Sequence, residues 1–223
     1  MFLTFEGLDF SGKTTQARIV VEKFKAPPPN SGVSPRMVQF IREPGGTRIS
    51  ERLRDILLDK KNLELRQMTE LLLFSASRAQ LVEEVILPAI RRGESVVCDR
   101  YYDSTTAYQG YGRGLDLATI RQINAVATFG LRPDLTVLVD IPVLEIDRRK
   151  ALAGLSFDRM EISGKAFYEK VRNGYREIAR EEPGRFIIAD GLRTIQELEQ
   201  DIWSAVACRE NSTTPTLGEG LHR

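Results

Sequence analysis

The sequence of 223 residues contains almost no histidine and little cysteine, and both shortages exclude kinds of chemistry. Its one histidine, His222, is the second residue from the end, which excludes histidine-based catalysis in the body of the chain. The two cysteines, Cys98 and Cys208, lack the spacing of a metal site. Cys98 stands in an apolar stretch, which is typical of a buried, inert thiol. The chemistry of this chain must therefore rest on other side chains.

The chain also lacks an excess of charge of either sign and any long apolar run. Its 32 Lys and Arg residues stand against 31 Asp and Glu residues, which gives a net charge of +1. This balance produces no overall attraction to nucleic acid or to a membrane surface. No apolar run approaches the length of a membrane span, and the first residues have the pattern of a core strand rather than of a signal peptide. We therefore expect a cytoplasmic protein that binds neither nucleic acid nor membranes.

Composition and length predict one globular unit. Hydrophobic residues make up 42% of the chain and charged residues 28%, which is ordinary for a globular protein. A chain of this length suits a single large domain, which we place at residues 1–208. Residues 209–223 are polar with scattered proline and glycine, so we expect a disordered tail there. The stretch 26–35 holds three successive prolines and predicts a surface loop.

The most informative stretch is residues 7–14, which match the phosphate-binding loop G-x-x-x-x-G-K-[ST] without a mismatch. The glycines permit a tight turn in which backbone N–H groups point at phosphate oxygens. The lysine then reaches the β- and γ-phosphates, and the threonine ligates Mg²⁺. A strand before the motif and a helix after it argue against a chance glycine turn. We expect a nucleoside triphosphate to bind at Gly7, Leu8, Asp9, Phe10, Ser11, Gly12, Lys13, Thr14 and Thr15.

Five short apolar stretches alternate with helical patterns, which predicts an α/β fold in which a five-stranded parallel sheet has helices on both faces. The expected strands are 2–5, 37–41, 95–98, 135–141 and 186–189. The expected helices are 14–25, 51–58, 65–92, 104–109, 117–129, a basic helix around 147–150, 161–181 and 194–207. Ser50 is the expected cap of the second helix, and Pro88 is the expected kink of the third.

Charged residues follow the carboxyl ends of these strands, where ligands bind in parallel α/β sheets. Besides the phosphate loop, these ends carry Arg42, Asp99 and Arg100. A kinase that joins two anionic substrates needs such arginines, because two polyphosphates repel each other until cations neutralise them. A GTPase is disfavoured, because the Asn-Lys-x-Asp guanine reader is missing and no Asp-x-x-Gly switch occurs outside the loop.

Four blocks in order resemble one family. They are residues 7–16 (GLDFSGKTTQ), 42–47 (REPGGT), 73–78 (LFSASR) and 99–110 (DRYYDSTTAYQG). Together they resemble the thymidylate kinases, and the similarity runs from residue 1 to about 207. The resemblance implies a three-layer P-loop kinase fold with a mobile lid. It also implies transfer of the γ-phosphoryl group of ATP to dTMP, giving dTDP, with Mg²⁺, by a homodimer that associates through the long helix at 65–92.

The resemblance assigns residues to the thymine and sugar of the acceptor. Phe74 matches the aromatic that stacks on thymine, and Arg78, on the same helix face, matches the arginine that hydrogen-bonds a thymine carbonyl. Thr105 matches a polar contact to thymine N3. Tyr108 matches the tyrosine that crowds the sugar 2′ position and so favours deoxynucleotides. The alternatives are core packing for the two aromatics and an exposed surface position for Arg78. Two flanking candidates are Ser104 and Gln109.

Arginines and aspartates complete the candidate site. Arg42 and Arg100 resemble the arginines that hold the acceptor phosphate, a task that suits the guanidinium fork. Asp9 matches a carboxylate near the sugar 3′-hydroxyl or the metal. Asp99, at a strand end, is a candidate to hold Mg²⁺ through water. Structural capping is the alternative for both aspartates. Pro44, two residues after Arg42, is a further substrate-binding candidate.

The phosphate loop contains no additional cation, whereas some family members carry one there that touches the γ-phosphate. Members without it supply arginines from the lid, which we place at about residues 145–163. Its cations are Arg148, Arg149 and Arg159, and which one reaches the transferring phosphoryl group stays open. A solvated helix face is the alternative for this charge run. Together with Lys13 and Arg100, these three are the predicted catalytic residues.

Two other functions are compatible with the phosphate loop. One is a kinase for another nucleotide or for a deoxynucleoside. The other is a nucleotide-dependent switch or assembly module, which would bind ATP without releasing ADP in response to an acceptor. The arginine-rich strand ends and the pair Phe74 and Arg78 favour the enzyme.

Overall fold

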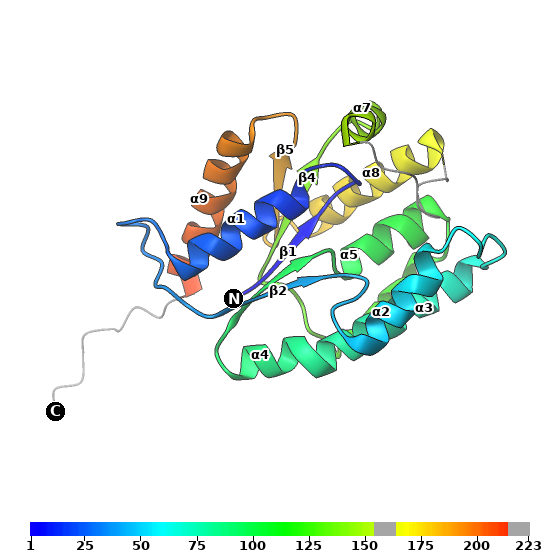
Figure 1. The fold of residues 1–223 in the computed structure, drawn as a ribbon, viewed down its shortest axis with the longest axis horizontal. Helices are drawn as coiled ribbons and strands as arrows, with labels where there is room; N and C mark the ends of the chain where they lie inside the picture. Colours follow the sequence, from blue (N-terminus) through cyan, green and yellow to red (C-terminus); the bar gives the residue numbers. More distant parts are fainter. Residues whose placement is uncertain (154–163, 214–223) are drawn as a thin grey trace.

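The structure, a computed structural model, describes residues 1–153 and 164–213 and contains one parallel sheet. Five strands lie in the order β2-β3-β1-β4-β5, so the strand that leads into the phosphate loop is central (Figure 1). This confirms the predicted five-stranded parallel sheet. The strands are β1 (Phe2–Glu6), β2 (Val38–Arg42), β3 (Ser95–Asp99), β4 (Leu135–Asp140) and β5 (Phe186–Asp190).

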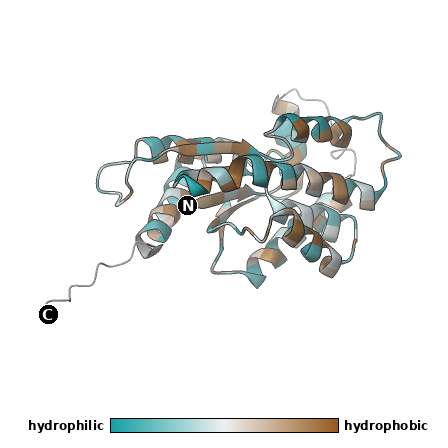
Figure 2. Cartoon of the chain, turned by 90° about the horizontal axis from the view of Figure 1, so that it is seen from below, coloured by the Kyte–Doolittle hydropathy of each residue, from teal (hydrophilic) through white to brown (hydrophobic). Residues whose placement is uncertain are grey.

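Helices connect the strands, and two π-helical turns, η1 and η2, interrupt or extend them. Figure 2 shows helices that carry both hydrophobic and hydrophilic residues around more uniformly hydrophobic strands. In chain order the helical elements are α1 (Lys13–Lys25), α2 (Arg48–Leu58), α3 (Gln67–Leu81), η1 (Val82–Ile86), α4 (Leu87–Arg91), α5 (Tyr102–Thr105), η2 (Thr106–Gly112), α6 (Leu117–Ala127), α7 (Leu144–Ala153), α8 (Lys165–Glu181) and α9 (Ile195–Thr213).

Alternating residues of the strands face two separate cores, which makes three layers. On one face, Leu3 and Phe5 of β1 pack with Phe24 of α1 and Trp203 of α9. On the other face, Phe2 packs with η1 and α4, while β4 and β5 pack with η2 and α8. Because successive side chains of a strand point to opposite faces, a central strand covered on both sides is buried throughout, as β1 is.

The start of the second helix differs from the prediction. The second helix begins at Arg48, and its cap is Thr47 rather than Ser50, because the Thr47 Oγ1 atom accepts the Ser50 N–H at 3.1 Å. The Ser50 hydroxyl is buried and donates to the Ser77 carbonyl at 2.9 Å, which ties α2 to α3. Ser50 therefore lies in the first turn of the helix, where its N–H is capped by Thr47 and its hydroxyl forms a tertiary contact.

The region predicted as one helix at 65–92 contains a wide turn. The Leu87 N–H bonds to the Val82 carbonyl, five residues back, directly before Pro88. Proline lacks an N–H and its ring displaces the carbonyl four residues before it. The π-turn η1 accommodates that displacement, so the helix widens where a kink was expected.

The glycines at 110–112 do not end a helix as predicted, because η2 continues through them to Gly112. A Cβ on Gly112 would lie 2.6 Å from the Phe167 ring, and one on Gly110 would lie 2.6 Å from Leu117. These glycines therefore allow α8 and α6 to pack closely against η2. The same contact carries α8 toward the carboxyl end of β1.

The last helix is longer than expected. It runs to Thr213, so residues 209–213 are helical rather than part of a disordered tail. The remainder of the predicted tail, 214–223, and residues 154–163 of the predicted lid lie outside the described residues. Within the described ranges, no helix combines the length and the apolar character that crossing a membrane requires.

Candidate active site

The phosphate loop joins β1 to α1 in a conformation that its glycines require. Gly7 has φ 137°, and a Cβ there would lie 2.4 Å from the Val139 carbonyl oxygen. Gly12 has φ 95° and caps α1. The thirteen-residue helix α1 therefore starts at the loop, with its first N–H groups and the positive end of its dipole directed there. This geometry suits a polyphosphate.

Lys13 lies within this loop, almost buried at 7% exposure. Its ammonium group donates to the Leu8 carbonyl at 3.3 Å and lies 3.9 Å from Asp9 Oδ1. Burial lowers the pKa of Lys13, and the neighbouring Arg100 charge lowers it further, while Asp9 opposes both. A buried ammonium group with so few partners favours an incoming anion.

Thr14 and Asp99 supply oxygens that fit Mg²⁺, the metal implied by the sequence. The Thr14 hydroxyl donates to Asp99 Oδ2 at 2.5 Å, while Oδ1 of the same buried carboxylate has no hydrogen-bond partner. An orphaned carboxylate oxygen beside a threonine hydroxyl is chemically suited to a hard cation or to its water. Among the described residues no group of three or more His, Cys, Asp or Glu residues is placed to hold a metal, so phosphate oxygens and water would complete the shell.

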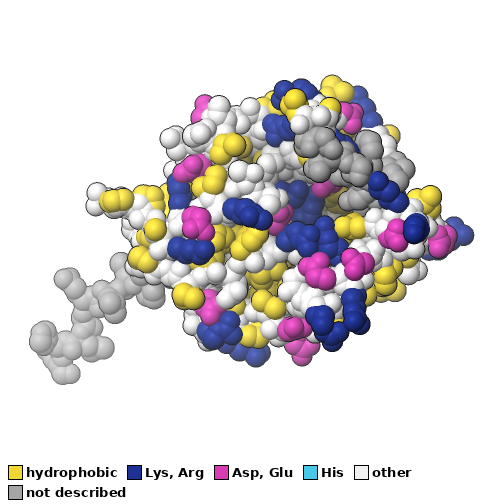
Figure 3. Space-filling model, in the orientation of Figure 1, with side chains coloured by type: hydrophobic (Ala, Val, Ile, Leu, Met, Phe, Trp, Pro, Cys, Tyr) yellow, Lys and Arg dark blue, Asp and Glu magenta, His cyan; other side chains and the backbone are white. Residues whose placement is uncertain are grey.

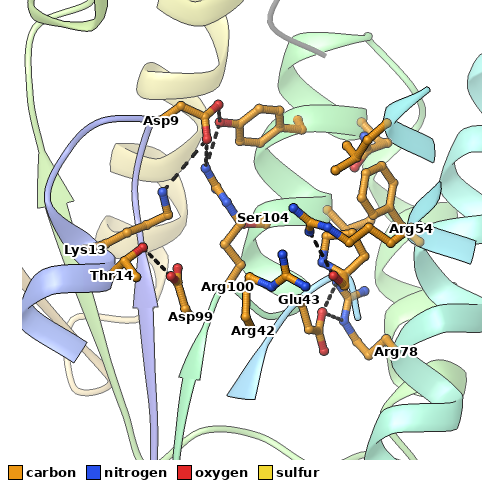
Figure 4. Close-up of a pocket in the computed structure, with 16 residues that line it drawn as sticks. Asp9, Lys13, Thr14, Arg42, Glu43, Arg54, Arg78, Asp99, Arg100 and Ser104 are labelled. Carbon is orange, nitrogen blue, oxygen red and sulfur yellow. Dashed lines mark hydrogen bonds and ion pairs between the residues drawn. The ribbon is translucent and has the colours of Figure 1, made fainter. Parts of the chain in front are cut away.

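A cavity of about 240 Å³ extends from this loop toward α3. Figure 4 shows its side chains converging from the loop, the ends of β2 and β3, and the helices α2, α3 and η2. Figure 3 shows Lys and Arg side chains gathered at the centre of the corresponding face. The lining residues are Asp9, Lys13, Thr14, Arg42, Glu43, Pro44, Arg54, Leu58, Phe74, Arg78, Asp99, Arg100, Ser104, Thr105, Tyr108 and Gln109.

Arg100 has the most hydrogen bonds of the cavity's arginines. Its Nη2 atom donates to Asp9 Oδ1 at 2.6 Å and to the Tyr108 hydroxyl at 3.3 Å. Its Nη1 atom donates to Ser104 Oγ and to the Tyr175 hydroxyl, both at 3.1 Å. Burial by itself raises the pKa of Asp9, but Arg100 and then Lys13 outweigh burial and lower that pKa overall. Asp9 therefore stays ionised between two cations.

Arg78 is buried at 2% exposure, which excludes the surface alternative for this residue. Its Nε atom donates to Glu43 Oε2 at 2.8 Å, and its Nη2 atom donates to the Tyr101 carbonyl at 3.2 Å. Burial raises the pKa of Glu43, and the Arg78 charge opposes that rise. The second oxygen of Glu43 is buried without a hydrogen-bond partner. The pair therefore leaves a hydrogen-bond acceptor, Glu43 Oε1, at the far end of the cavity.

Sequence reasoning missed three residues that line the cavity, namely Glu43, Arg54 and Leu58. Arg54 donates to the Pro44 carbonyl at 2.9 Å. Two signals were available in the sequence. Glu43 stands inside the REPGGT block, and Arg54 and Leu58 are four residues apart on one helix, hence on one face. Arg42 also lines the cavity, where its guanidinium group forms a 3.0 Å ion pair with Glu51.

The arginines of the predicted lid lie in different places. Arg149 lies at the phosphate loop, where its Nη1 atom donates to the Phe10 and Ser11 carbonyls and its Nη2 atom donates to the Gly191 carbonyl at 2.6 Å. Arg148 points elsewhere and is exposed, with a 2.8 Å ion pair to Glu145. The structure therefore brings Arg149 and not Arg148 to the site, and Arg159 lies outside the described residues.

A second, open hollow of about 420 Å³ lies on the other side of the loop. It shares Asp9, Lys13 and Thr14 with the first cavity, so the two spaces meet at the Lys13 cation. Such an arrangement can hold two anions end to end. The residues that line the hollow are Asp9, Phe10, Gly12, Lys13, Thr14, Thr15 and Arg149.

Comparison with known proteins gives one consistent result. The sequence model of the family described as thymidylate kinase matches residues 5–202. The thymidylate kinase of Geotalea uraniireducens is 45% identical over 93% of this chain and 97% of that protein. The one from Deinococcus radiodurans is 46% identical over 94% and 97%, respectively. The crystal structure of thymidylate kinase from Ehrlichia chaffeensis matches with a TM-score of 0.71 and 32% identity, over 92% of this chain and 98% of that one.

Proposed function

The chain belongs to the thymidylate kinase family, and we propose that its cavity carries out the reaction of that family, transfer of the γ-phosphoryl group of ATP to dTMP. The observation that carries this proposal is the continuity of one cavity from Lys13 and Thr14 to Phe74. Phosphoryl transfer needs donor and acceptor in line on either side of the moving group. The two spaces that meet at Lys13 satisfy this requirement.

The far end of the cavity suits thymine. Phe74 offers a flat ring for stacking, and the buried pair of Arg78 and Glu43 offers hydrogen-bonding groups for the base edge. Thr105 and Gln109 line the same wall, and the Gln109 Nε2 atom already donates to Glu70 at 2.9 Å. An apolar slot with a few fixed polar groups is the usual construction of a small-molecule site. The residues that the sequence predicts for thymine binding therefore line one cavity.

The near end suits the acceptor phosphate. Arg100 and Arg42 face the space next to Lys13, and a guanidinium group pairs bidentately with phosphate. The acceptor phosphate is itself an anion at neutral pH, so the reaction needs no general base. The chain supplies positioning and charge neutralisation through Lys13 and Arg100. Arg149, on the donor side of the loop, is our candidate for the cation that the lid supplies.

Mg²⁺ is part of the proposal as a partner of ATP. It would be held by Thr14 and Asp99, whose free Oδ1 atom is otherwise an uncompensated buried acceptor. When bound, the ion neutralises charge on the β- and γ-phosphates. Asp9 is less suited to the metal, because Arg100 already occupies one of its oxygens at 2.6 Å and Tyr108 approaches the other at 3.2 Å.

An acceptor panel tests the proposal. ADP release is measured from ATP and Mg²⁺ with dTMP, dUMP, dCMP, thymidine or no acceptor. We expect release that depends on dTMP and is slow without an acceptor. A preference for thymidine or for another monophosphate would assign the chain to a different acceptor. ATP binding with no acceptor-dependent release would leave a nucleotide-dependent switch.

We also propose that the chain is a homodimer that associates through helix α3 and its neighbours. α3 packs against both α2 and α6, and each of the three helices exposes large apolar side chains. Burial of such a surface by a second copy removes apolar area from water. Sedimentation equilibrium should give twice the chain mass of 25.2 kDa, and Leu72→Glu should shift the protein to the monomer. The exposed residues are Ile49, Ile56, Met68, Leu72 and Val126.

A further inference from the structure

Glu6, the last residue of β1, is a fully buried carboxylate directly beneath the cavity. Its Oε1 atom accepts the Tyr101 backbone N–H at 2.7 Å. Its Oε2 atom accepts the Ser104 hydroxyl at 2.6 Å and the Tyr175 hydroxyl at 2.9 Å. Three donors, from the start of α5, from α5 itself and from α8, therefore converge on one carboxylate, which does not itself line the cavity.

The same two hydroxyl groups face Arg100. The Arg100 Nη1 atom donates to Ser104 Oγ and to the Tyr175 hydroxyl, both at 3.1 Å. Guanidinium has donors and no acceptor, so each hydroxyl must present a lone pair to Arg100 and turn its hydrogen elsewhere. Glu6 is the acceptor on the far side of both hydroxyls. The two hydroxyl oxygens also lie 2.8 Å from each other, so the hydrogen of either hydroxyl can point to Glu6 or to the other hydroxyl.

Glu6 acts on the backbone of Arg100 as well. Arg100 has φ 71°, which is uncommon for a residue other than glycine and persists only where the surroundings hold it. The peptide that follows ends in the Tyr101 N–H, and this N–H is bound by Glu6. The preceding peptide is held by the Arg100 N–H, which bonds to the Phe5 carbonyl at 2.9 Å. The turn that aims Arg100 is therefore fixed from β1.

We propose that Glu6 is a positioning residue for Arg100, which its carboxylate orients toward the acceptor phosphate through Ser104, Tyr175 and the Tyr101 N–H. The inference rests on the proposed function, in which Arg100 holds that phosphate. Asp9 holds the other side of the guanidinium group at 2.6 Å. The Arg100 guanidinium group is therefore held on one side by Asp9 directly and on the other by Glu6 through two hydroxyl groups.

An amide cannot replace this carboxylate. If the amide oxygen of a glutamine accepts the Tyr101 N–H, its NH₂ group faces the two hydroxyls, which lose the shared acceptor for their hydrogens and must divide their lone pairs between this NH₂ group and Arg100. If the amide is reversed, its NH₂ group faces the Tyr101 N–H. Only an ionised carboxylate satisfies all three donors. Loss of a hydrogen bond to a charged group corresponds to about a 10- to 100-fold change in a binding constant, here the KM for dTMP.

The charges around Glu6 determine the pH at which to test this. Burial, and after it the Asp103 charge, raise the pKa of Glu6 while Arg100 lowers it, so that the pKa is about 7 overall. An assay at pH 8 therefore keeps the carboxylate mostly ionised in the wild type. The groups that face Glu6 or act on it are Lys13 of α1, Cys98 of β3, Arg100 and Asp103 after β3, and Tyr175 of α8.

Steady-state kinetics of Glu6→Gln, with dTMP and ATP varied separately at pH 8, test the proposal. We expect the KM for dTMP to rise about 10-fold or more, while the KM for ATP changes less than about twofold. A loss of folded protein alone would lower the apparent kcat and leave both KM values unchanged. Glu177→Gln, at an exposed carboxylate on the same helix as Tyr175, is the matched control and should leave both constants unchanged.

Tyr175→Phe is the second variant, which keeps the ring and removes one bridging hydroxyl. We expect the KM for dTMP to rise about threefold and this effect to vanish when Glu6→Gln is already present, because both changes break one connection. Equal changes in both KM values, an unchanged KM for dTMP, or additive effects in the double variant would overturn the proposal. The wild type is measured alongside: if it releases no ADP with dTMP, the proposed function fails, and this inference with it. Failure confined to the variants overturns this inference alone.

Discussion

Removal of the ring of Tyr108 should weaken the preference for a deoxyribose acceptor. The ring lines the acceptor cavity and is only 7% exposed. It packs edge-on against Phe167, Tyr168 and Tyr175, with ring centroids 6.0, 6.5 and 6.3 Å away. A ring wedged among three others cannot swing aside without opening the core. If the acceptor sugar lies against this ring as proposed, the ring leaves no space for a ribose 2′-hydroxyl.

The size of the effect follows from this packing. Selection against one small group by an apolar wall amounts to about 1–3 kcal/mol, or roughly 10- to 200-fold. Tyr108→Ala should therefore lower the ratio of kcat/KM for dTMP to kcat/KM for ribothymidine 5′-monophosphate by about 10- to 100-fold. Tyr108→Phe keeps the ring and should keep the ratio. It loses only the hydroxyl contacts to Asp9 and Arg100, at 3.2 and 3.3 Å.

Stability has to be separated from specificity in this experiment. Truncation of a buried aromatic to alanine costs about 3–5 kcal/mol, which lowers the Tm of a chain of this size by roughly 6–20 °C. The assay therefore runs well below the Tm of the alanine variant, and circular dichroism confirms that it is folded. A ratio is insensitive to the folded fraction, because both acceptors compete for the same active molecules.

Two outcomes would refute the reasoning about Tyr108. An unchanged ratio in Tyr108→Ala would remove the ring from the discrimination and leave it a packing role. An equal loss of discrimination in Tyr108→Phe would transfer the role to the hydroxyl and to its contacts with Asp9 and Arg100. Only loss in the alanine variant with retention in the phenylalanine variant supports the steric argument.

The remaining predictions concern the phosphate loop and a buried ion pair. Lys13→Ala should lower kcat by about 100- to 1,000-fold, the range for one lost charge-stabilising donor, and leave the dTMP dissociation constant within about twofold by calorimetry; equal losses of turnover and dTMP binding would mean that Lys13 holds the fold. Asp103→Asn should lower the free energy of unfolding in urea by about 1.5–3 kcal/mol, because Arg185 Nη1 and Nη2 bond to Asp103 at 2.7 and 2.9 Å in the core and would keep Glu182, at 2.7 Å from Nε, as the remaining anionic partner; a loss below about 1 kcal/mol would contradict that account.

Local signals determined the parts of this protein that depend on adjacent residues. The glycines and the lysine of residues 7–14 specify the phosphate loop, because a turn with positive φ and its following helix are encoded within one stretch. The apolar strands were found to within about a residue or two at either end for the same reason. The predicted start of the second helix was wrong because Thr47 supplies the cap that was expected from Ser50.

Four short blocks identify the family from the sequence alone, and each of them stands at a strand end or on one helix face. The identity of the residues that line the cavity followed from those blocks for Phe74, Arg100 and Tyr108. It did not follow for Arg54, which reaches the cavity from α2 only because α2 packs on α3. The sequence also could not tell which of Arg148 and Arg149 reaches the phosphate loop. Neighbouring residues of a helix point in directions about 100° apart, and only packing determines which side of the helix faces the loop.

The tertiary structure alone decided the role of Glu6. Nothing in the sequence connects a glutamate at position 6 with a serine at 104 and a tyrosine at 175, since the three meet only when α8 packs against η2 at Gly112. Backbone preferences act over a few residues, whereas the arrangement of buried charges and hydroxyls depends on which elements are brought into contact. The sequence by itself therefore determined where phosphate binds, and packing between distant segments decided how the arginine opposite it is held.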